Sequence, residues 1–381
     1  MFNNIYQNKR VLITGQTGFK GSWLSIWLKE LRAEVIGYSL EPPSEPNNFD
    51  ASRLKNRIIH IHGDVRNLDH LLEAFHQYQP EFVFHLAAQP LVRLSYEEPK
   101  LTFDTNVGGT VNVLEAVRLT NSVKVIVNMT SDKCYENREW VWGYRENDPM
   151  GGHDPYSASK GCAELAFNAY LKSFFRKEPS NDRTIGAASV RAGNVIGGGD
   201  WGKDRIIPDC VRALSANESI GIRNPHAVRP WQHVLEPLSG YLWLGALLQE
   251  DPQKYSGAWN FGPDDDSHLT VAEMVNRLIK YWGIGPWHDL SDPKAPHEAK
   301  LLKLCCDKAH AELKWYSALS IDECLQMTAE WYKEYYSGNQ TKDMYPFCLG
   351  HIHRYAETAA AKRMVYTKPY QSHQDTEVKH G

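Results

Sequence analysis

A tyrosine and a lysine four residues apart are the first side chains in this sequence whose types and spacing suggest chemistry. Tyr156 and Lys160 lie in the run YSASK. Residues at positions i and i+4 of a helix share one face, so the lysine ammonium would lie beside the phenol and lower its pKa. A phenolate held in this way is a general base for a hydroxyl group. The same spacing also occurs in ordinary pairs on helix surfaces, so the surrounding motifs must decide between the two interpretations.

A hydroxyl, a carboxylate and an amine stand side by side in the run NMTSDKCY at residues 128–135. These are Ser131, Asp132 and Lys133, and they follow an apolar stretch at 124–129 that we expect to be a strand. Residues just beyond the carboxyl end of a strand in an open parallel sheet face the crevice where ligands bind. The three groups therefore suggest a proton-transfer set. The alternative is a Ser/Asp-rich turn with a solvated lysine.

A glycine-rich loop, TGQTGFKG at residues 14–21, separates an expected strand at 10–13 from an expected helix at 19–31. Glycines at this spacing allow a tight turn and let backbone N–H groups approach a pyrophosphate. The helix N-terminus adds positive potential for the diphosphate. We therefore expect the loop to bind a dinucleotide through Gly15, Thr17, Gly18, Phe19, Lys20 and Gly21.

Two further positions suggest which dinucleotide is bound. Ser39 stands where the second strand would end in an acid that grips the adenosine ribose, and no arginine follows nearby to hold a 2′-phosphate. NAD is therefore favoured over NADP. Asp64 and Val65, after the third strand, are expected to contact the adenine, although Asp64 could equally serve as a turn or cap residue.

The order of elements predicts how these motifs are brought together. Strands that read as continuous apolar runs alternate with helical patterns, which is typical of a parallel sheet covered on both faces. We expect strands at 10–13, 34–38, 58–62, 82–86, 124–129 and 184–191, and helices at 19–31, 68–77, 101–120, 156–176, 207–214 and 321–336. The predicted fold class is α/β, a doubly wound parallel (Rossmann) sheet with a smaller mixed α/β substrate lobe.

This pattern also suggests domain boundaries. We expect residues 1–193 to form the NAD-binding Rossmann domain, with 230–262 returning to it. The rhythm breaks after residue 194, so 194–229 and 263–345 are expected to form the substrate lobe. Residues 346–381 would be a C-terminal extension with a frayed end.

The amino-acid composition limits the classes of binding partner that we expect for this protein. Forty-two Lys and Arg against 46 Asp and Glu give a net charge of −4, which argues against nucleic acid or an anionic membrane as a partner. The first ten residues are polar, and no apolar stretch approaches the roughly 18 residues of a membrane span. The seven cysteines are scattered, so we expect reduced thiols in a cytoplasmic protein.

Two clusters of possible metal ligands are weaker evidence for a functional site than the motifs above. Cys348, His351 and His353 lie within six residues, but a metal site would need a fourth ligand, and none is visible, so we expect no metal. His60 and His62 fall on the expected third strand and would be core or edge residues.

Together the three motifs resemble those of the extended short-chain dehydrogenase/reductase superfamily. The run TSDKCY is similar to the site of the nucleotide-sugar 4,6-dehydratases within it, except that Lys133 replaces a glutamate. With GQTGFKGSWL, GNVIGGGDW and RPWQHVLEPL, the sequence looks like the CDP-glucose 4,6-dehydratases over about residues 9–336. The resemblance implies NAD as cofactor and CDP-glucose as substrate; nothing in composition or spacing indicates cytosine.

The resemblance also implies roles for the catalytic residues. Tyr156 would remove the proton of the sugar C4 hydroxyl, Ser131 would orient that oxygen, and Asp132 would protonate the C6 hydroxyl. Lys133 would be the base at C5 if burial and the nearby cofactor cation lower its pKa and keep its amine neutral. Otherwise it would stay charged and stabilise the enolate while another group takes the proton.

Further positions follow from the family pattern. Ala87, Ala88 and Asn106 would line the NAD site, although Asn106 could also be a helix cap. The substrate would be bound by Gln89, Asn194, Arg205 and Arg229, of which either arginine alone could be an ordinary surface residue. Relatives in this family pair two helices per subunit, so we expect a homodimer, possibly a tetramer, with contacts through Leu165, Phe167, Tyr170 and Phe174.

Three alternatives remain at this point. A 4-epimerase or reductase would need Tyr156 and Lys160 but no acid–base pair after the fifth strand. A non-catalytic dinucleotide sensor would be expected to lack the tyrosine or the lysine. A purely structural α/β protein would not account for the glycine loop.

Overall fold

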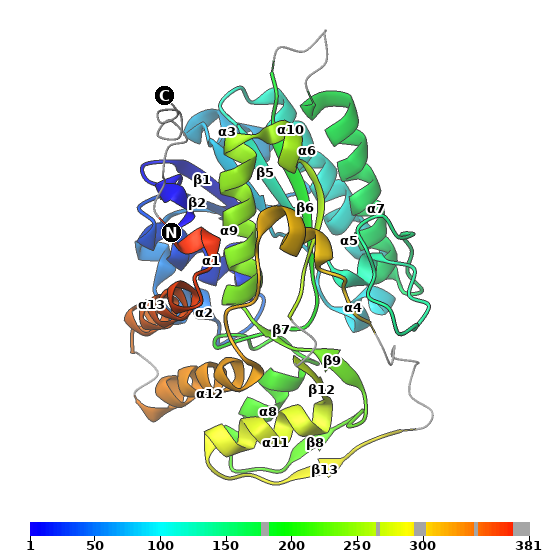
Figure 1. The fold of residues 1–381 in the computed structure, drawn as a ribbon, viewed down its shortest axis with the longest axis vertical. Coiled ribbons are helices and arrows are strands. Elements are labelled where there is room, and N and C mark those ends of the chain that lie inside the picture. The colour runs from blue at the N-terminus through cyan, green and yellow to red at the C-terminus, as the bar shows by residue number, and fades with distance from the viewer. Residues whose placement is uncertain (177–182, 264–266, 293–301, 339–341, 369–381) are drawn as a thin grey trace, which may run out of the picture.

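A seven-stranded parallel sheet is the centre of the molecule (Figure 1). The computed structural model describes residues 1–176, 183–263, 267–292, 302–338 and 342–368. In the order β11-β6-β5-β4-β1-β2-β3, the sheet reverses direction of growth between β1 and β4, and ligands bind at such a switch point. The strands are β1 (Arg10–Thr14), β2 (Glu34–Ser39), β3 (Ile59–His62), β4 (Phe82–His85), β5 (Val125–Met129), β6 (Gly186–Ala192) and β11 (Gly257–Phe261). The predicted doubly wound fold is confirmed.

Helices cover both faces of this sheet, as alternate strand residues require. Leu12, Val83 and Ile126 pack with α3, α6 and α7, whereas their strand neighbours pack with α1 and α9. The helices of this part of the chain are α1 (Phe19–Glu30), α2 (Asn48–Ala51), α3 (Leu68–Tyr78), α4 (Val92–Glu97), α5 (Pro99–Phe103), α6 (Gly109–Leu119), α7 (Pro155–Tyr170), α9 (Leu235–Glu250) and α10 (Pro252–Tyr255). Two π-helical turns, η3 (Asp104–Gly108) and η5 (Leu171–Phe175), join α5 to α6 and end α7.

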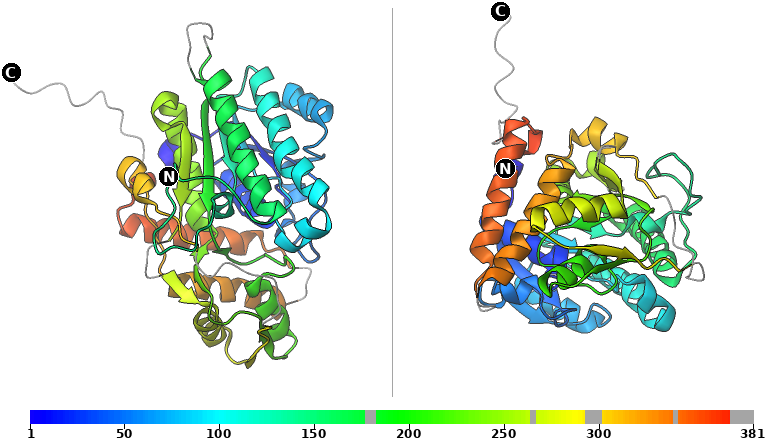
Figure 2. Two further views of the ribbon diagram at one scale, coloured as in Figure 1. Left: turned by 90° about the vertical axis from the view of Figure 1, so that its right-hand side faces the viewer. Right: turned by 90° about the horizontal axis from the view of Figure 1, so that it is seen from below.

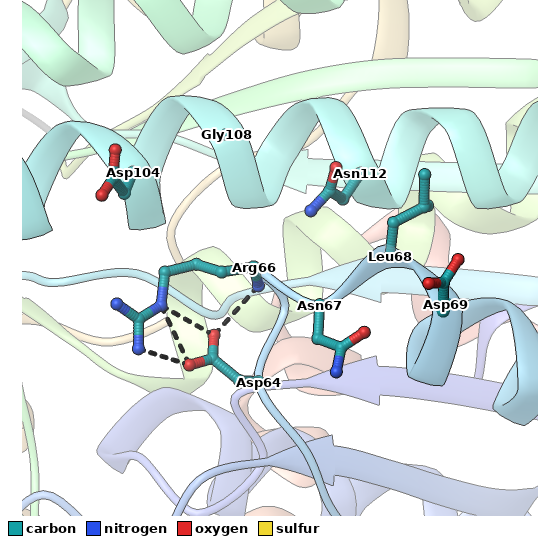
Figure 3. A pocket seen from close by; sticks show the side chains of 8 residues that line it. All are labelled: Asp64, Arg66, Asn67, Leu68, Asp69, Asp104, Gly108 and Asn112. Carbon is teal, nitrogen blue, oxygen red and sulfur yellow. Dashed lines mark hydrogen bonds and ion pairs between the residues drawn. The ribbon is translucent and has the colours of Figure 1, made fainter.

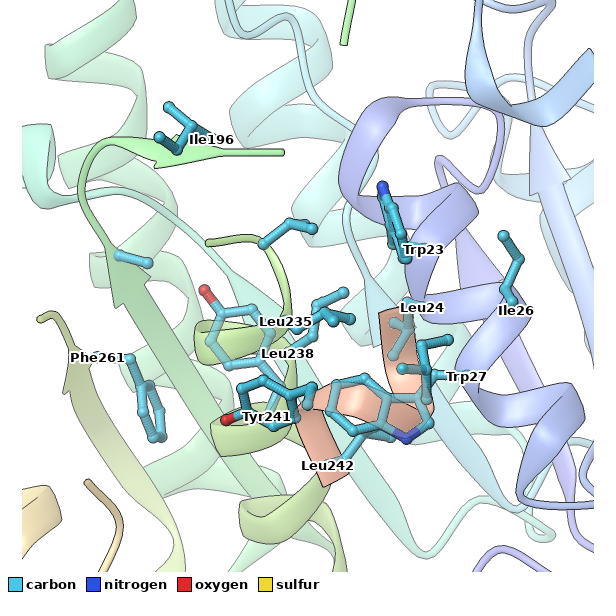
Figure 4. Close-up of a cluster of buried hydrophobic side chains, with 14 of the residues drawn as sticks. Trp23, Leu24, Ile26, Trp27, Ile196, Leu235, Leu238, Tyr241, Leu242 and Phe261 are labelled. Carbon is cyan, nitrogen blue, oxygen red and sulfur yellow. The ribbon is translucent and has the colours of Figure 1, made fainter. Parts of the chain in front are cut away.

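Helix α9 is buried on nearly every side. It packs on β5 and β6, next to α1 on the same face of the sheet, and Figure 4 shows Trp23 and Trp27 of α1 beside Leu238 and Leu242 of α9. Because a helix that is apolar all round must be a core element, its long apolar run explains its position. Through α9 and β11, residues 235–261 return to the first sheet.

The smaller lobe lies beyond the carboxyl ends of the strands, at the bottom of Figure 1. Its strands pair into three two-stranded ladders, and together with its helices they form a mixed α/β unit, as expected. The elements are β7 (Val195–Ile196), α8 (Ile206–Ser215), β8 (Ile220–Ile222), β9 (Val228–Pro230), β10 (Gln232–His233), β12 (His268–Thr270), α11 (Val271–Trp282), β13 (Trp287–Asp289) and α12 (Ile321–Ser337).

The C-terminal region holds a helix that the sequence pattern did not lead us to expect. Helix α13 (Tyr345–Ala361) packs against α1, with Cys348, His351 and Tyr355 on its buried face. The buried positions of this face recur with helical spacing in the sequence, but some of them are polar or aromatic residues, so the pattern did not read as an apolar one. The expected frayed end, residues 369–381, lies outside the described residues.

The structure separates the possible metal ligands of α13. His353 points outward and its Nε2 lies 2.7 Å from Glu30 Oε1, whereas Cys348 and His351 face the core. Among the residues that the structure describes, no three His, Cys, Asp or Glu side chains are grouped as a metal site would need. None of the described helices is both long and apolar enough to cross a membrane.

A buried carboxylate holds the C-terminal segments on the sheet domain. Glu236, in the first turn of α9, accepts hydrogen bonds from the backbone N–H groups of Ala318 and Leu319 and from the Tyr355 hydroxyl. Burial raises the pKa of Glu236 to about 7, although these donors oppose the shift. A carboxyl with a raised pKa holds its proton longer in the folded chain than in the unfolded chain, so it destabilises the fold as pH rises.

We therefore expect Glu236→Gln to flatten the pH dependence of stability. Between about pH 4.5 and 7 the wild-type free energy of unfolding should fall by up to about 1.4 kcal/mol per pH unit from this group alone. The amide mimics the protonated acid and should remove that slope. Urea unfolding at pH 5 and pH 7 measures it, with the exposed Glu218→Gln as control. Equal slopes in wild type and Glu236→Gln would contradict the assignment.

Candidate active site

The glycine loop after β1 has the shape that a bound pyrophosphate requires. Gly15 has φ +76°, and a Cβ there would lie 2.8 Å from the backbone nitrogen of Ala87. A Cβ on Gly21 would lie 2.2 Å from the Gly15 carbonyl oxygen, so the helix start is packed directly on the loop. Gly18 is the N-cap of α1, which directs free backbone N–H groups into the loop. The residues present thus fit a dinucleotide phosphate.

Hydroxyl groups line the edge of this loop next to β2. Ser39 Oγ lies 3.0 Å from Thr17 Oγ1, and both hydroxyls also contact the Leu40 carbonyl. The expected ribose position is therefore tied to the glycine loop by neutral hydrogen bonds, with no carboxylate at that point.

Asp64 makes the contacts of a turn residue, which was the alternative to a contact with the adenine. Its Oδ1 accepts the backbone N–H of Arg66 at 2.9 Å, and its carboxylate also pairs with the Arg66 guanidinium. That hydrogen-bonded guanidinium lowers the pKa of Asp64. Figure 3 shows the pair in a hollow that also includes Asn67, Asp104 and Asn112. Val65 is buried against Gly109, so this segment is anchored to α6.

Tyr156 and Lys160 lie on the inner face of α7, as their spacing predicted. Asp154 caps the helix by accepting the Ser157 N–H at 2.9 Å, and Pro155 occupies the first turn. The helix is held from the other side by Asn106 in the η3 turn. The Asn106 amide donates to Ser159 Oγ at 2.8 Å, and its side-chain oxygen accepts the Gln89 N–H. Asn106 therefore connects the cofactor side of β4 to the catalytic helix.

The expected depression of the tyrosine pKa is wrong. Burial raises the pKa of Tyr156 to about 12, a hydrogen bond to Ser131 opposes the shift, and Asp132 adds to it. Burial also lowers the pKa of Lys160 to about 8, partly countered by Glu164. Both side chains are removed from water in the same cleft. The lysine therefore carries less positive charge than an exposed lysine would, and its effect on the pKa of the phenol is smaller than the effect of desolvation.

The loop after β5 brings the second motif to the first. Ser131 is the N-cap of the short helix η4 (Asp132–Cys134), and its Oγ donates to Asp132 Oδ1 at 2.9 Å. Ser131 also lowers the pKa of Tyr156, so its side chain acts on the phenol as well. Asp132 is buried, which raises its pKa, while Lys133 opposes the shift. The hydroxyl, the acid and the phenol thus form one contiguous set.

Of the three groups in this loop, Lys133 is the one whose surroundings differ from those expected. Its side chain is exposed, whereas its neighbours Asp132 and Cys134 are buried. The burial on which its role as a neutral base partly rests is therefore not provided by the chain itself.

Lys20 lies at the start of α1 and faces the same charges. Burial and the neighbouring Arg205 and Lys160 lower its pKa to about 8, whereas Asp132 and Asp200 act in the opposite direction. Lys20 therefore lies between the glycine loop, the catalytic acid and the smaller lobe.

The four expected substrate residues are placed differently from one another. Arg205 pairs with Asp200 at 2.9 Å at the edge of the smaller lobe, and the charge of Arg229 acts on Asp132. Asn194 directly precedes β7 in the same region. The amide of Gln89 is instead bonded to Leu91 and Thr102 within its own segment, so it does not join the others. Ala87 and Ala88 continue the segment that leads to it.

A buried ion pair beneath the catalytic loop was not anticipated from the sequence. Arg191 of β6 donates to both carboxylate oxygens of Glu164 at 2.8 and 2.7 Å, and both side chains are almost completely buried. Thr130 and Ser189 donate to the same carboxylate. Glu164 is four residues after Lys160, so its place on the catalytic face was readable from helical periodicity. Its partner lies 27 residues away and was not.

The pair also reaches the far end of the catalytic loop. Arg191 donates to the Tyr135 hydroxyl at 2.5 Å and to the Glu146 carbonyl at 3.1 Å. Tyr135 in turn donates to Asn260 of β11. Because Thr130 and Tyr135 flank Ser131 and Asp132, both ends of the catalytic loop are held by one buried network.

Comparison with known proteins now identifies the family. The model described as GDP-mannose 4,6 dehydratase matches residues 12–328. The chain belongs to the GDP-mannose 4,6 dehydratase family. It is 51% identical over 335 residues to the CDP-glucose 4,6-dehydratase of Salmonella typhimurium, covering 88% of this chain and 93% of that protein. It is 31% identical over 296 residues to the CDP-paratose 2-epimerase of Salmonella typhi, covering 72% and 85%.

Solved structures share the fold of this family member. A dTDP-glucose 4,6-dehydratase from Bacillus anthracis in complex with NAD superposes with a TM-score of 0.70 at 20% identity, over 86% of this chain and 97% of that one. A UDP-glucose 4-epimerase from Thermotoga maritima with UDP-glucose gives 0.71 at 21% identity, over 85% and 99%. At these identities the likeness concerns the fold.

We expect Glu164→Gln to lower the free energy of unfolding by about 3 kcal/mol. The change leaves the buried Arg191 guanidinium without its opposite charge, and breaking one partner of a buried pair is costly. Chemical denaturation measures the loss. Glu115→Gln is the matched control, because its pair with Arg118 at 2.6 Å lies at the surface of α6 and should contribute less than about 1 kcal/mol. Equal losses in the two variants would contradict a special role for the buried pair.

Proposed function

We propose that this protein is an NAD-dependent nucleotide-sugar 4,6-dehydratase that converts CDP-D-glucose to CDP-4-dehydro-6-deoxy-D-glucose and water. The observation that carries the proposal is the buried acid Asp132 bonded to the Ser131 hydroxyl at 2.9 Å, beside Tyr156, whose pKa Ser131 lowers. A base for a sugar hydroxyl would suffice for an epimerase, whereas a buried acid bonded to the same hydroxyl serves an elimination of water. The 51% identity to a CDP-glucose 4,6-dehydratase supports the choice of CDP.

The chain's own residues would hold NAD at the switch point of the sheet. The glycine loop and the N-terminus of α1 fit the pyrophosphate, Ser39 and Thr17 lie on the ribose side, and Lys160 would hold the nicotinamide ribose. When bound, NAD would accept a hydride from C4 of the sugar and return it to C6.

Tyr156 would begin the reaction by removing the proton of the C4 hydroxyl. Ser131 would donate a hydrogen bond to that oxygen and orient it toward the phenolate. Burial holds the pKa of Tyr156 at about 12 without ligand, so the phenolate needs further positive charge beside it. The partly charged Lys160 and a bound oxidised cofactor would supply this charge.

Asp132 and Lys133 would carry the elimination of water. A ketone at C4 acidifies the C5 proton, and Asp132, whose pKa is raised by burial, would donate the proton that the C6 hydroxyl needs in order to leave as water. The exposure of Lys133 favours the second of its two roles, in which a charged ammonium stabilises the enolate. A substrate that covers Lys133 would favour the first role, in which the neutral amine removes the C5 proton.

The substrate would lie between the two parts of the chain. We assign the cofactor to residues 1–193 with 230–262, and the nucleotide sugar to residues 194–229 and 263–345. Arg205 and Arg229 would pair with the diphosphate, and Asn194 would contact the same group. Arg205 is held by Asp200 in the ligand-free chain, so the diphosphate would compete with that carboxylate.

The outer faces of α5, α6 and α7 support a homodimer; tetramer formation through another face is open. These helices lie side by side in Figure 2, and Phe103, Leu119 and Leu165 project from them into solvent. Leu165 is 61% exposed, and Phe174 is also exposed, whereas Phe167 is 2% exposed and belongs to the core, so it is not a contact residue. A large apolar face of this kind is typical of an interface between subunits. None of the seven cysteines forms a disulfide, which agrees with a cytoplasmic location.

The proposed activity is tested by incubating the protein with NAD and, separately, with CDP-, dTDP-, UDP- and GDP-linked hexoses. We expect a 4-keto product, detected by its absorbance in alkali, from CDP-glucose in preference to the others. Conversion to an epimer without loss of water would indicate the epimerase alternative. Absence of any product with all four donors would overturn the proposal.

Two variants serve as controls for the chemistry. Tyr156→Phe removes the base and should abolish both cofactor reduction and dehydration. Lys133→Met should still oxidise C4, seen as NADH absorbance, and should fail to release water. Normal turnover by Lys133→Met would remove Lys133 from the mechanism.

We expect Leu165→Lys to convert the dimer to a monomer, because it places a charge at the centre of the apolar face of α7. Sedimentation velocity measures the change. Ile284→Lys is the control, since Ile284 is exposed in the smaller lobe, away from these helices. A wild-type protein that sediments as a monomer would contradict the assignment of the dimer.

A further inference from the structure

His85 is a buried imidazole at the point where the strand order of the sheet reverses. It ends β4 and is paired in register with Thr14, the last residue of β1. Its side chain is 1% exposed, and the proposed mechanism gives it no role. Both ring nitrogens have partners, and these lie on different elements. Nδ1 lies 2.6 Å from Thr14 Oγ1, and Nε2 lies 3.1 Å from Thr110 Oγ1 of α6.

The surrounding donors and acceptors determine which nitrogen of His85 carries the proton. A threonine hydroxyl has one proton and two lone pairs. The backbone N–H groups of the two residues after His85 both donate to Thr14 Oγ1 at 3.2 Å, so the Thr14 proton is left for Nδ1. The Thr110 hydroxyl donates to the Asn106 carbonyl at 2.7 Å, so it accepts from Nε2. The ring is therefore the neutral tautomer with its proton on Nε2.

The environment of His85 maintains this neutral form. Burial, together with the charge of Lys160, lowers the pKa of His85 to about 3. A proton added to Nδ1 would face the Thr14 hydroxyl, whose two lone pairs are already occupied by backbone N–H groups. The ring thus keeps one acceptor and one donor in fixed positions throughout the physiological pH range.

On one side, His85 orients the backbone that supports the glycine loop. Thr14 Oγ1 directs its proton to His85 Nδ1 and accepts the N–H of Ala87. A Cβ on Gly15 would lie 2.8 Å from the same Ala87 nitrogen, so the first glycine of the loop packs directly on this backbone. Rotation of the Thr14 hydroxyl would therefore disturb the surface on which the pyrophosphate loop rests.

On the other side, His85 is connected to the catalytic helix. Thr110, which accepts from Nε2, donates to the Asn106 carbonyl. The Asn106 amide donates to Ser159 Oγ at 2.8 Å, and the Ser159 hydroxyl donates to the Tyr156 carbonyl at 2.7 Å. All of these side chains are buried, so the hydrogen bonds do not compete with bulk water.

We propose that His85 is a positioning residue that aligns the glycine loop expected to bind NAD with the helix that carries Tyr156. This role rests on the proposed dehydratase function. His85 would act through Thr14 on the glycine loop and through Thr110 on the catalytic helix. Its two nitrogens therefore have separable roles. Nδ1 supports the affinity for NAD, and Nε2 supports the rate at which bound NAD is used.

Asparagine and glutamine each reproduce one ring nitrogen of histidine. The asparagine side-chain oxygen can replace Nδ1 as the acceptor, and the glutamine amide nitrogen can replace Nε2 as the donor. We compare His85→Asn with His85→Gln and use His76→Gln, at an exposed position of α3, as the matched control. Isothermal titration calorimetry of the full-length protein freed of nucleotide gives the dissociation constant for NAD. The kcat for CDP-glucose is measured at saturating NAD.

We expect the two variants to lose different properties. His85→Gln should raise the dissociation constant for NAD about tenfold and change kcat less than about twofold, because it loses only the partner Thr14. His85→Asn should lower kcat about tenfold and leave the affinity for NAD nearly unchanged. Thr110→Val keeps the imidazole and should reproduce the fall in kcat, which keeps the test decisive if a variant of His85 does not fold. His76→Gln should change neither value.

Equal losses of affinity and of kcat in the two His85 variants would mean that the imidazole only supports local packing, and the proposal would be overturned. Wild-type values in both variants would overturn it as well. Wild-type protein that binds NAD but forms no 4-keto product would instead refute the dehydratase function. In that case the NAD affinities of the two variants would still test the role of Nδ1, so the two failures are distinguishable.

Discussion

The buried pair of Glu164 and Arg191 is the interaction on which the geometry of the active site depends. Its carboxylate lies one helical turn after Lys160, and its guanidinium reaches the hydroxyl of Tyr135. Thr130 and Tyr135, the two ends of the catalytic loop, are bonded to the two members of the pair. The helix that carries Tyr156 and the loop that carries Asp132 are therefore fixed to the same pair of charges, which keeps Ser131 close to Tyr156.

Desolvation sets the electrostatics of the cleft around this frame. It raises the pKa of Tyr156 to about 12 and lowers that of Lys160 and Lys20 to about 8, so each group is held closer to its neutral form than it would be in water. In the proposed reaction the site would be prepared for catalysis only once a cationic cofactor adds its charge. Formation of the base would then depend on cofactor binding, and a reactive phenolate would not form before the cofactor binds.

Much of the fold was predictable because its signals are local. The strands and the longer helices of the first 192 residues follow from apolar runs and helical periodicity, and their bounds differ from expectation by one or two residues at most ends, whereas the short helices α2 and α4 were not expected. Helix α13 was missed because its buried face includes His351 and Tyr355, which hide the periodicity. The expected contact Phe167 was assigned to the outer face of α7, whereas its orientation toward the sheet depends on which side of the helix packs.

The sequence by itself determined the fold class, the glycine loop and the residues proposed for proton transfer, since all of these are set by residue type and short-range spacing. Only the tertiary structure decided that Arg191 neutralises Glu164, that Asp64 turns to Arg66, and that Lys133 faces solvent. Charge pairing and desolvation depend on which distant segments meet in space. A side chain's pKa and its partners are therefore properties of the packed molecule, and no spacing along the chain specifies them.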